Sequence, residues 1–150
     1  MMFSMILVPL DGSETAKKAA KYAVGFAKQT GAKIKFIGVV EGNRYLAKSV
    51  PARKSPTHLI ETVEDYLRQA AEAYLKEAEI LCRENGVQSR KVIRSGHPVE
   101  EIVKEAKKSK PDLIIMGSHG KSAIKAAVLG SVTFGVIHND TIIPVLVVRR

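Results

Sequence analysis

The sequence Asp112-Leu-Ile-Ile-Met-Gly-Ser-His-Gly-Lys-Ser122, followed further along by Gly130-Ser-Val-Thr133, decides how the rest of the chain is interpreted. Its apolar run, which ends at Met116, is typical of a strand buried on both faces of a sheet, and a glycine follows directly. The second segment opens an apolar stretch at Ser131, a residue type favoured as a helix N-cap. We therefore expect a central strand, a glycine loop and then a short helix.

Both segments have features of a phosphate site. Gly117 and Gly120 can adopt backbone angles closed to other residues, so that successive N–H groups turn toward an anion. The first N–H groups of a helix starting at Ser131 would supply further donors. Together they suggest a polyphosphate ligand, with ordinary turn and capping roles as the alternative. The loop is not a Walker A motif, because Ile115 stands where that motif needs a glycine.

Strand and helix patterns alternate along the whole chain. The expected strands are residues 5–10, 33–40, 91–94, 112–116 and 143–148, and the expected helices are 16–28, 58–85, one that starts at residue 98, and 131–139. This alternation predicts one α/β domain over residues 1–150, a Rossmann-like open sheet of five mainly parallel strands with helices on both faces. Residues 42–57 break the rhythm and are expected to form a variable loop, which is either functional or a tolerated insertion.

In such sheets, ligands bind at the carboxyl ends of strands where the strand order reverses. The end of the first strand, at Pro9 and Asp11, the end of the second, at Val39, and the loop at Gly117 are therefore expected to be neighbours. Asp11 has an alternative role as a cap of the first helix, and Val39 has one as a core residue.

The formal charge of +9 raises the question of nucleic-acid binding. The lysines are dispersed along helix faces, however, and only 5% of the residues are aromatic. Base recognition on single strands usually needs aromatic side chains for stacking. A solvated basic surface is the better interpretation, and nucleic-acid binding is the least favoured function.

Other residue types narrow the function further. The single cysteine, Cys82, excludes an internal disulfide and lies on the apolar stripe of an expected helix, which indicates packing. The four histidines are far apart, so we expect no dedicated metal site. The longest apolar runs are too short to cross a bilayer and no secretion signal is evident. A cytoplasmic location without membrane contact is expected.

With these residues in view, the chain resembles the universal stress protein family, and specifically its ATP-binding branch. The family's nucleotide signature is glycine, two residues, glycine, nine residues, glycine, then serine or threonine, which Gly117, Gly120, Gly130 and Ser131 match. Three further stretches carry the resemblance: Val8-Pro-Leu-Asp11 with Ser13-Glu-Thr15, Gly96-His-Pro-Val-Glu-Glu-Ile102, and Asp112-Leu-Ile-Ile-Met-Gly117.

The resemblance implies a set of ligand contacts. Adenine would lie near Pro9 and Val39, and Asp11 would hold the ribose hydroxyls with help from Met116 and Gly117. The phosphates would be surrounded by the backbone of Ser118, His119, Gly120, Lys121 and Ser122 and by Ser131, Val132 and Thr133. Mg²⁺ or Mn²⁺ would be held mainly by the phosphates of ATP, or of ADP or AMP. The family also implies a homodimer through residues 143–148.

These inferences favour a nucleotide-dependent regulatory or sensor protein in the stress response, with an unidentified protein partner. No catalytic residue is assigned, since phosphoryl transfer needs a placed base and charge stabilisation, but weak ATP hydrolysis is compatible with the loops. The enzyme alternative is an adenylating enzyme of related fold. Residues 10–15, Leu-Asp-Gly-Ser-Glu-Thr, depart from the loop patterns of such enzymes.

Overall fold

The computed structural model describes residues 3–41, 57–119, 129–139 and 142–149. Along the chain lie β1 (Met5–Leu10), α1 (Glu14–Thr30), β2 (Lys33–Val40), α3 (Thr57–Glu84), β3 (Ser89–Ser95), α4 (Pro98–Ser109), β4 (Leu113–Gly117), α5 (Ser131–Ile137) and β5 (Val145–Val148). The predicted alternation is confirmed. The last strand is shorter than expected at its start, where Pro144 lacks a backbone donor, and β3 is longer than expected.

The five strands form one parallel sheet in the order β3-β2-β1-β4-β5. The chain therefore moves outward from β1 through β2 to β3, and then returns to add β4 and β5 on the other side of β1. The order reverses between β1 and β4, which is where open α/β sheets hold their ligands.

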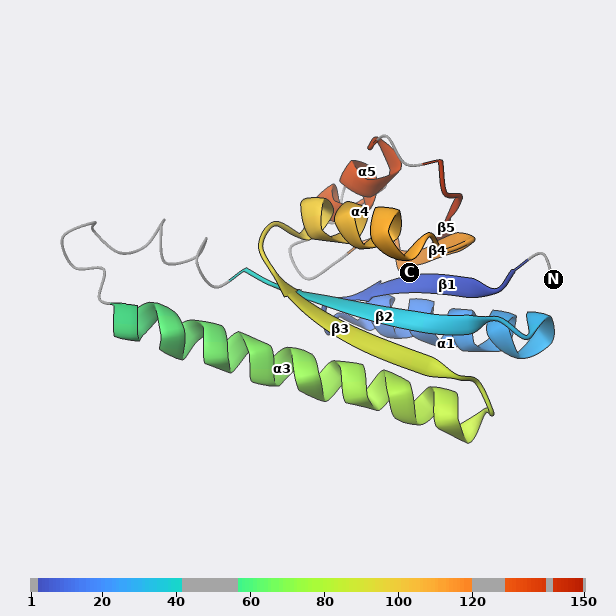
Figure 1. Ribbon diagram of the computed structural model, residues 1–150, viewed down its shortest axis with the longest axis horizontal. Coiled ribbons are helices and arrows are strands. Elements are labelled where there is room, and N and C mark those ends of the chain that lie inside the picture. The colour runs from blue at the N-terminus through green and yellow to red at the C-terminus, as the bar shows by residue number, and fades with distance from the viewer. Residues whose placement is uncertain (1–2, 42–56, 120–128, 140–141, 150) are drawn as a thin grey trace.

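Helices cover both faces of the sheet, as predicted. In Figure 1, α1 and α3 lie on one face, and α4 and α5 lie on the other. One buried cluster joins the first pair of helices to β1 and β2, and a second cluster lies under α4 and α5. Both faces of β1 are therefore buried, which explains its continuous apolar sequence.

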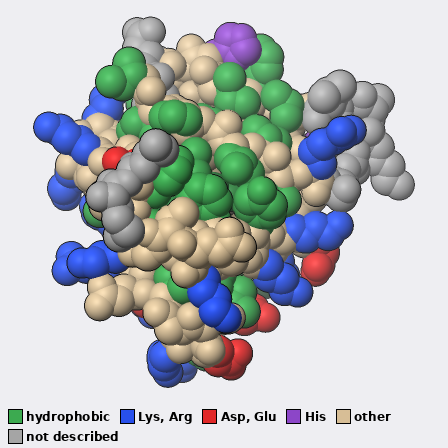
Figure 2. All heavy atoms as spheres, turned by 90° about the vertical axis from the view of Figure 1, so that its right-hand side faces the viewer, with side chains coloured by type: hydrophobic (Ala, Val, Ile, Leu, Met, Phe, Trp, Pro, Cys, Tyr) green, Lys and Arg blue, Asp and Glu red, His purple; other side chains and the backbone are tan. Residues whose placement is uncertain are grey.

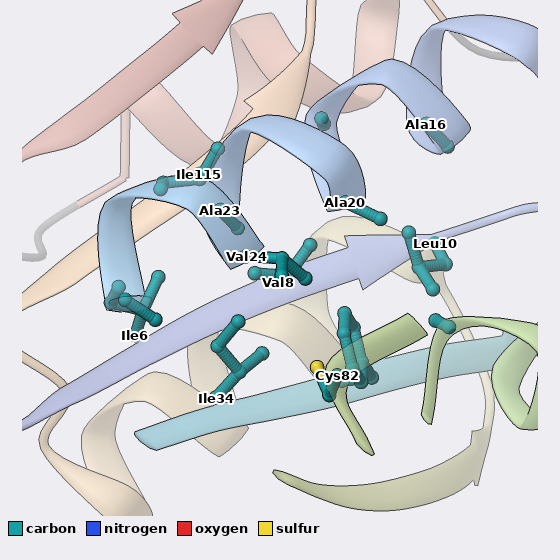
Figure 3. Close-up of a cluster of buried hydrophobic side chains, with 14 of the residues drawn as sticks. Ile6, Val8, Leu10, Ala16, Ala20, Ala23, Val24, Ile34, Cys82 and Ile115 are labelled. Atoms are coloured by element: carbon teal, nitrogen blue, oxygen red, sulfur yellow. The ribbon is translucent and has the colours of Figure 1, made fainter. Parts of the chain in front are cut away.

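Small residues on α1 let this helix lie close against the sheet. Figure 3 shows Ala20, Ala23 and Val24 of α1 facing β1, with Cys82 of α3 in the same cluster. Cys82 is fully buried, and burial raises the pKa of its thiol. Its predicted packing role is confirmed.

A buried carboxylate connects α4 to β2 and β3. Glu105 is only 2% exposed. Its oxygens lie 2.7 Å from Lys35 Nζ on β2 and 2.9 Å from Arg94 Nη2 on β3, and Ser109 Oγ donates to it over 3.1 Å. Burial raises the pKa of Glu105, but these hydrogen bonds outweigh burial and hold the pKa below its ordinary value.

Candidate functional site

A cleft of about 220 Å³ opens at the carboxyl edge of the sheet, beside the point where the strand order reverses. Ends of β1, β2 and β4 form its floor, and α1, α3, α4 and the start of α5 form its walls. It brings together most of the site residues predicted from the sequence: Pro9, Asp11, Val39, Met116, Gly117, His119, Gly130, Ser131, Val132 and Thr133. The expected convergence of strand ends is thus present.

The start of α5 is held against the end of β4 by two hydrogen bonds. The backbone N–H of Gly130 donates to the Ser118 carbonyl over 2.7 Å, and the Thr133 hydroxyl donates to the Gly117 carbonyl over 2.8 Å. Thr133 is 3% exposed, so its hydroxyl serves this contact inside the protein. Because the two bonds join residues 117 and 118 to residues 130 and 133, they fix the distance between the two segments.

The helix cap differs from the expectation for Ser131. Gly130 is the N-cap of α5 and makes no side-chain capping bond, while Ser131 is the first helical residue. Intrahelical bonding begins with the Phe134 N–H, which donates to the Gly130 carbonyl. The N–H groups of residues 131–133 therefore have no acceptor within the helix.

Gly117 is required for a reason other than the one predicted. Positive φ occurs at Gly12, Gly31, Gly86 and Gly96 among the described glycines, and Gly117 is not one of them. Instead, a Cβ on Gly117 would lie 2.9 Å from the backbone carbonyl atoms of Thr15 in α1. The absent side chain lets the end of β4 approach the first turn of α1.

Ser118 departs from its predicted role. Its backbone N–H donates to the Val148 carbonyl of β5 over 2.9 Å, so this amide extends the sheet and is not offered to a phosphate. Its Oγ lies 3.0 Å from Nδ1 of His119, and both residues are buried. Ser118 does not line the cleft.

His119 is buried just past the end of β4. It is 6% exposed, and its carbonyl accepts a hydrogen bond from the Thr15 hydroxyl. The ring lies next to Ser118, as its Nδ1 contact shows. His119 therefore forms part of the wall between α1 and β4 and still lines the cleft.

Asp11 lines the cleft and lies two residues before the N-cap of α1. Ser13 is the N-cap, and its Oγ accepts from the Ala16 N–H over 3.2 Å. The Asp11 Oδ1 accepts from the Ser13 N–H over 2.9 Å, which orients the carboxylate. Asp11 therefore supports the turn without capping the helix itself.

The predicted residues Gly120, Lys121 and Ser122 lie outside the described part of the chain, as do residues 42–56 of the expected loop. Within that part, no three His, Cys, Asp or Glu side chains are grouped to hold a metal ion. None of the helices formed by the described residues is long and apolar enough to span a membrane.

Several lining residues were missed from the sequence. They come mainly from α3 and α4, and include Leu67, Ala70, Tyr74, Pro98 and Ile102. Burial, followed by the charge of Asp11, raises the pKa of Tyr74 to about 12. An apolar stripe on a helix indicates a buried face, but a stripe cannot tell which turns face a cleft and which face the core.

The fold and the cleft define a doubly wound α/β protein with a small-molecule pocket at its topological switch point. The sequence model of the Universal stress protein family matches residues 2–149. The chain belongs to this family.

Individual relatives agree with this assignment. Universal stress protein MJ0531 of Methanocaldococcus jannaschii is 35% identical over 99% of this chain and 84% of its own length. Universal stress protein MJ0577 of the same organism is 32% identical over 100% of this chain and 97% of its own length. The solved structure of MJ0577 superposes with a TM-score of 0.84, covering 100% of this chain and 98% of that one.

Two more distant solved structures contain nucleotides. A universal stress protein in complex with cAMP is 23% identical, with a TM-score of 0.69 over 98% of this chain and 97% of that one. The Archaeoglobus fulgidus universal stress protein in complex with dAMP is 20% identical, with a TM-score of 0.64 over 98% of each chain. At these identities, the comparison with this chain establishes the fold alone.

Proposed function

We propose that this protein binds an adenine nucleotide, with ATP the first candidate and ADP or AMP the alternatives, in the cleft at the carboxyl edge of the sheet. It acts as a cytoplasmic, nucleotide-dependent regulatory protein in the stress response and signals occupancy to a protein partner. The observation that carries the proposal is the convergence of β1, β2, β4 and α5 on one cleft, at the strand-order reversal. Relatives of this fold in complex with cAMP and dAMP support it.

Each part of the nucleotide has a suitable surface in the cleft. Apolar side chains of Pro9, Val39 and Met116 suit the base, and the Asp11 carboxylate suits the ribose hydroxyls. The N–H groups at residues 131–133, which have no acceptor within α5, suit phosphate oxygens together with the loop at Gly120. Mg²⁺ or Mn²⁺ would be bound mainly by the phosphates.

The size of the cleft agrees with a ligand that is partly outside it. Its volume of about 220 Å³ is below the range of about 300–1,000 Å³ typical of sites for whole small molecules. We therefore expect the base and ribose to lie inside, with the phosphates extending past Ser131, which is exposed.

Binding should dominate over turnover. Hydrolysis needs a base or a water-orienting group at the γ-phosphate. His119 is a poor candidate for this role, because its Nδ1 is within hydrogen-bonding distance of Ser118 Oγ. We expect weak hydrolysis at most, far below the rates of about 1–10³ s⁻¹ that enzymes reach.

The test is calorimetric titration of the protein with ATP and Mg²⁺, with a matched pair of substitutions on α3. Ala70 lines the cleft and Ala73 does not, and both are exposed on the same helix. Ala70→Trp fills the cleft, while Ala73→Trp adds the same side chain elsewhere. We expect wild type and Ala73→Trp to bind in the micromolar range, about −8 kcal/mol.

Ala70→Trp should lose most of that affinity while its circular dichroism spectrum remains that of the wild type. Equal affinity in the two variants would place the nucleotide elsewhere. Steady-state release of phosphate, measured on the same samples, separates a regulator from an efficient ATPase.

We also propose that the protein forms a homodimer through its last strand. β5 is the edge of the sheet on the β4 side, and its residues Val145–Val148 are all half-buried hydrophobics. An apolar edge strand exposes unpaired backbone groups unless another chain covers it. Figure 2 shows the end of the molecule that is at the right in Figure 1, where hydrophobic side chains gather centrally with Lys and Arg around them.

A further inference from the structure

Tyr74 reaches the cleft because of a glycine on the neighbouring strand. A Cβ on Gly38 of β2 would lie 3.1 Å from the Tyr74 hydroxyl and 3.2 Å from Cδ1 of Leu75. Contacts at this distance are tighter than side chains usually make. Gly38 thus lets α3 pack closely on β2 and lets the phenol lie across the strand, where it forms part of the cleft wall.

The Tyr74 hydroxyl makes no hydrogen bond to another described residue. Every fully buried polar side-chain atom of the described residues has a partner, so the hydroxyl oxygen is at least partly accessible. Because its pKa is about 12, raised by burial and by the charge of Asp11, the phenol is protonated throughout the physiological range. It is therefore a hydrogen-bond donor that a ligand in the cleft can use.

Asp11 supplies the complementary group. Its carboxylate lines the same cleft and is near enough for its charge to act on Tyr74. A carboxylate accepts about four hydrogen bonds and donates none, whereas a phenol donates one. Two neighbouring hydroxyl groups, each both donor and acceptor, match this pair: one donates to the carboxylate and the other accepts from the phenol.

We infer that Tyr74 is a specificity-determining residue, whose hydroxyl acts with Asp11 to recognise the two ribose hydroxyls, so that the cleft favours ribonucleotides over deoxyribonucleotides. The inference rests on the proposed function, because it names the sugar that the nucleotide cleft selects. A site that hydrogen-bonds a ligand hydroxyl rejects the analogue that lacks it, since its own polar groups are then unpaired.

This selectivity belongs to side chains of this chain and not to the fold. An Archaeoglobus fulgidus relative of the same fold is found in complex with dAMP, so the fold itself admits a deoxyribose. Tyr74 comes from α3, outside the glycine segments that contain the nucleotide signature, and can therefore vary without loss of phosphate binding.

The experiment measures the affinities of ATP, 2′-deoxy-ATP and 3′-deoxy-ATP for wild type and for Tyr74→Phe. Wild type should bind ATP more tightly than both analogues. Loss of one neutral hydrogen bond corresponds to roughly a two- to tenfold change in affinity. Tyr74→Phe should therefore weaken ATP by this factor and leave at least one deoxy analogue unchanged, since that analogue lacks the hydroxyl that Tyr74 contacts.

Tyr66→Phe is the matched control, because Tyr66 lies on the same helix and is 71% exposed. It should leave all three affinities unchanged. A second variant, Gly38→Ala, should shift the phenol and reduce ATP affinity in the same selective way. Unfolding curves must show that each variant is folded. We expect Tyr74→Phe to fold, because removal of its hydroxyl leaves no described acceptor without a partner.

The outcomes separate this inference from the proposed function. If wild type binds ATP but Tyr74→Phe weakens all three nucleotides equally, or none, the sugar assignment is wrong and nucleotide binding stands. If wild type binds the three nucleotides equally, the assignment is also wrong. If wild type binds none of them, both proposals are removed.

Discussion

Gly117 at the end of β4 lies directly against Thr15 in the first turn of α1, with room for no side chain between them. A Cβ on Gly117 would come within 2.9 Å of the Thr15 carbonyl carbon and oxygen, and within 3.1 Å of its Cβ. Thr15 also donates its hydroxyl to the carbonyl of His119, two residues past Gly117. The floor and one wall of the cleft therefore depend on this contact.

Gly117→Ala should destabilise the protein because backbone atoms of Thr15 cannot move aside as a flexible side chain would. Overpacking of this kind costs about 1–3 kcal/mol. The free energy of unfolding in urea measures it. Gly25→Ala is the control, since Gly25 is exposed in the middle of α1 with nothing within 4 Å of its Cβ position.

Gly25→Ala should raise the stability by roughly 0.5–1 kcal/mol, because alanine loses less backbone entropy in a helix. If Gly117→Ala is as stable as wild type, β4 and α1 do not need to approach so closely.

Thr133→Val should loosen the start of α5. The substitution removes the hydroxyl that donates to the Gly117 carbonyl over 2.8 Å and leaves that acceptor without this partner. The expected loss is about 1–3 kcal/mol in the free energy of unfolding, together with weaker ATP binding. Thr133→Ser keeps the hydroxyl and should retain most of both. A valine variant with the stability and affinity of wild type would show that the bond is dispensable.

The sequence predicted the parts of this structure that are governed by periodicity. The strand at residues 5–10 has its expected bounds, and the helix expected at residues 16–28 is observed over Glu14–Thr30, because buried runs and caps are local signals. Strand ends such as Asp11 and Gly117 were placed at the cleft by a topological rule that needs only the order of elements. The bounds depend on short-range patterns, and the placement of the strand ends depends on the order of the elements along the chain.

What the sequence did not predict depends on tertiary contacts. Nothing local shows that the Ser118 amide pairs with Val148, or that Gly117 is a glycine because of Thr15. The position of Tyr74 at the cleft depends on the packing of α3 over Gly38. These contacts depend on which surfaces of the chain meet in the folded protein. Local sequence patterns do not show this.

Glu105 should make the stability depend on acid pH. Its pKa in the folded protein is below the ordinary value of 4.5, despite burial, because Lys35, Arg94 and Ser109 donate to its ionised form. The stabilisation is therefore complete above pH 4.5 and is lost as the pH falls through the lower, folded-state value.

Glu105→Gln should be less stable than wild type at pH 7, by about 1.5–3 kcal/mol for lost bonds to a charged group. The difference should shrink as the pH falls below 4.5, because wild type then loses the same interactions. Urea unfolding at several pH values measures both. Glu100→Gln, on the exposed face of the same helix, should follow the wild-type profile. A constant difference at all pH values would contradict the assigned cause.

Val147→Pro should separate the proposed dimer without unfolding the subunit. The carbonyls of Pro144 and Val148 accept from Ile114 of β4 and from Ser118, the residue after β4, so in a parallel ladder the backbone groups of Val147 point to the opposite, outer side. Proline is tolerated on an edge strand whose N–H faces outward, and there it removes a donor that a second chain would need. Light scattering coupled to gel filtration should give a dimer for wild type and a monomer for Val147→Pro.

Val147→Thr is the control for this substitution, because it keeps the backbone N–H and the branched shape, and it should remain a dimer. A wild-type monomer would remove the dimer proposal outright. A folded Val147→Pro variant that stays dimeric would move the interface away from the β5 edge, because no pairing of that strand through the Val147 amide could then form. The exposed side chains of Phe134 and Ile137 on α5 would be the next surface to test.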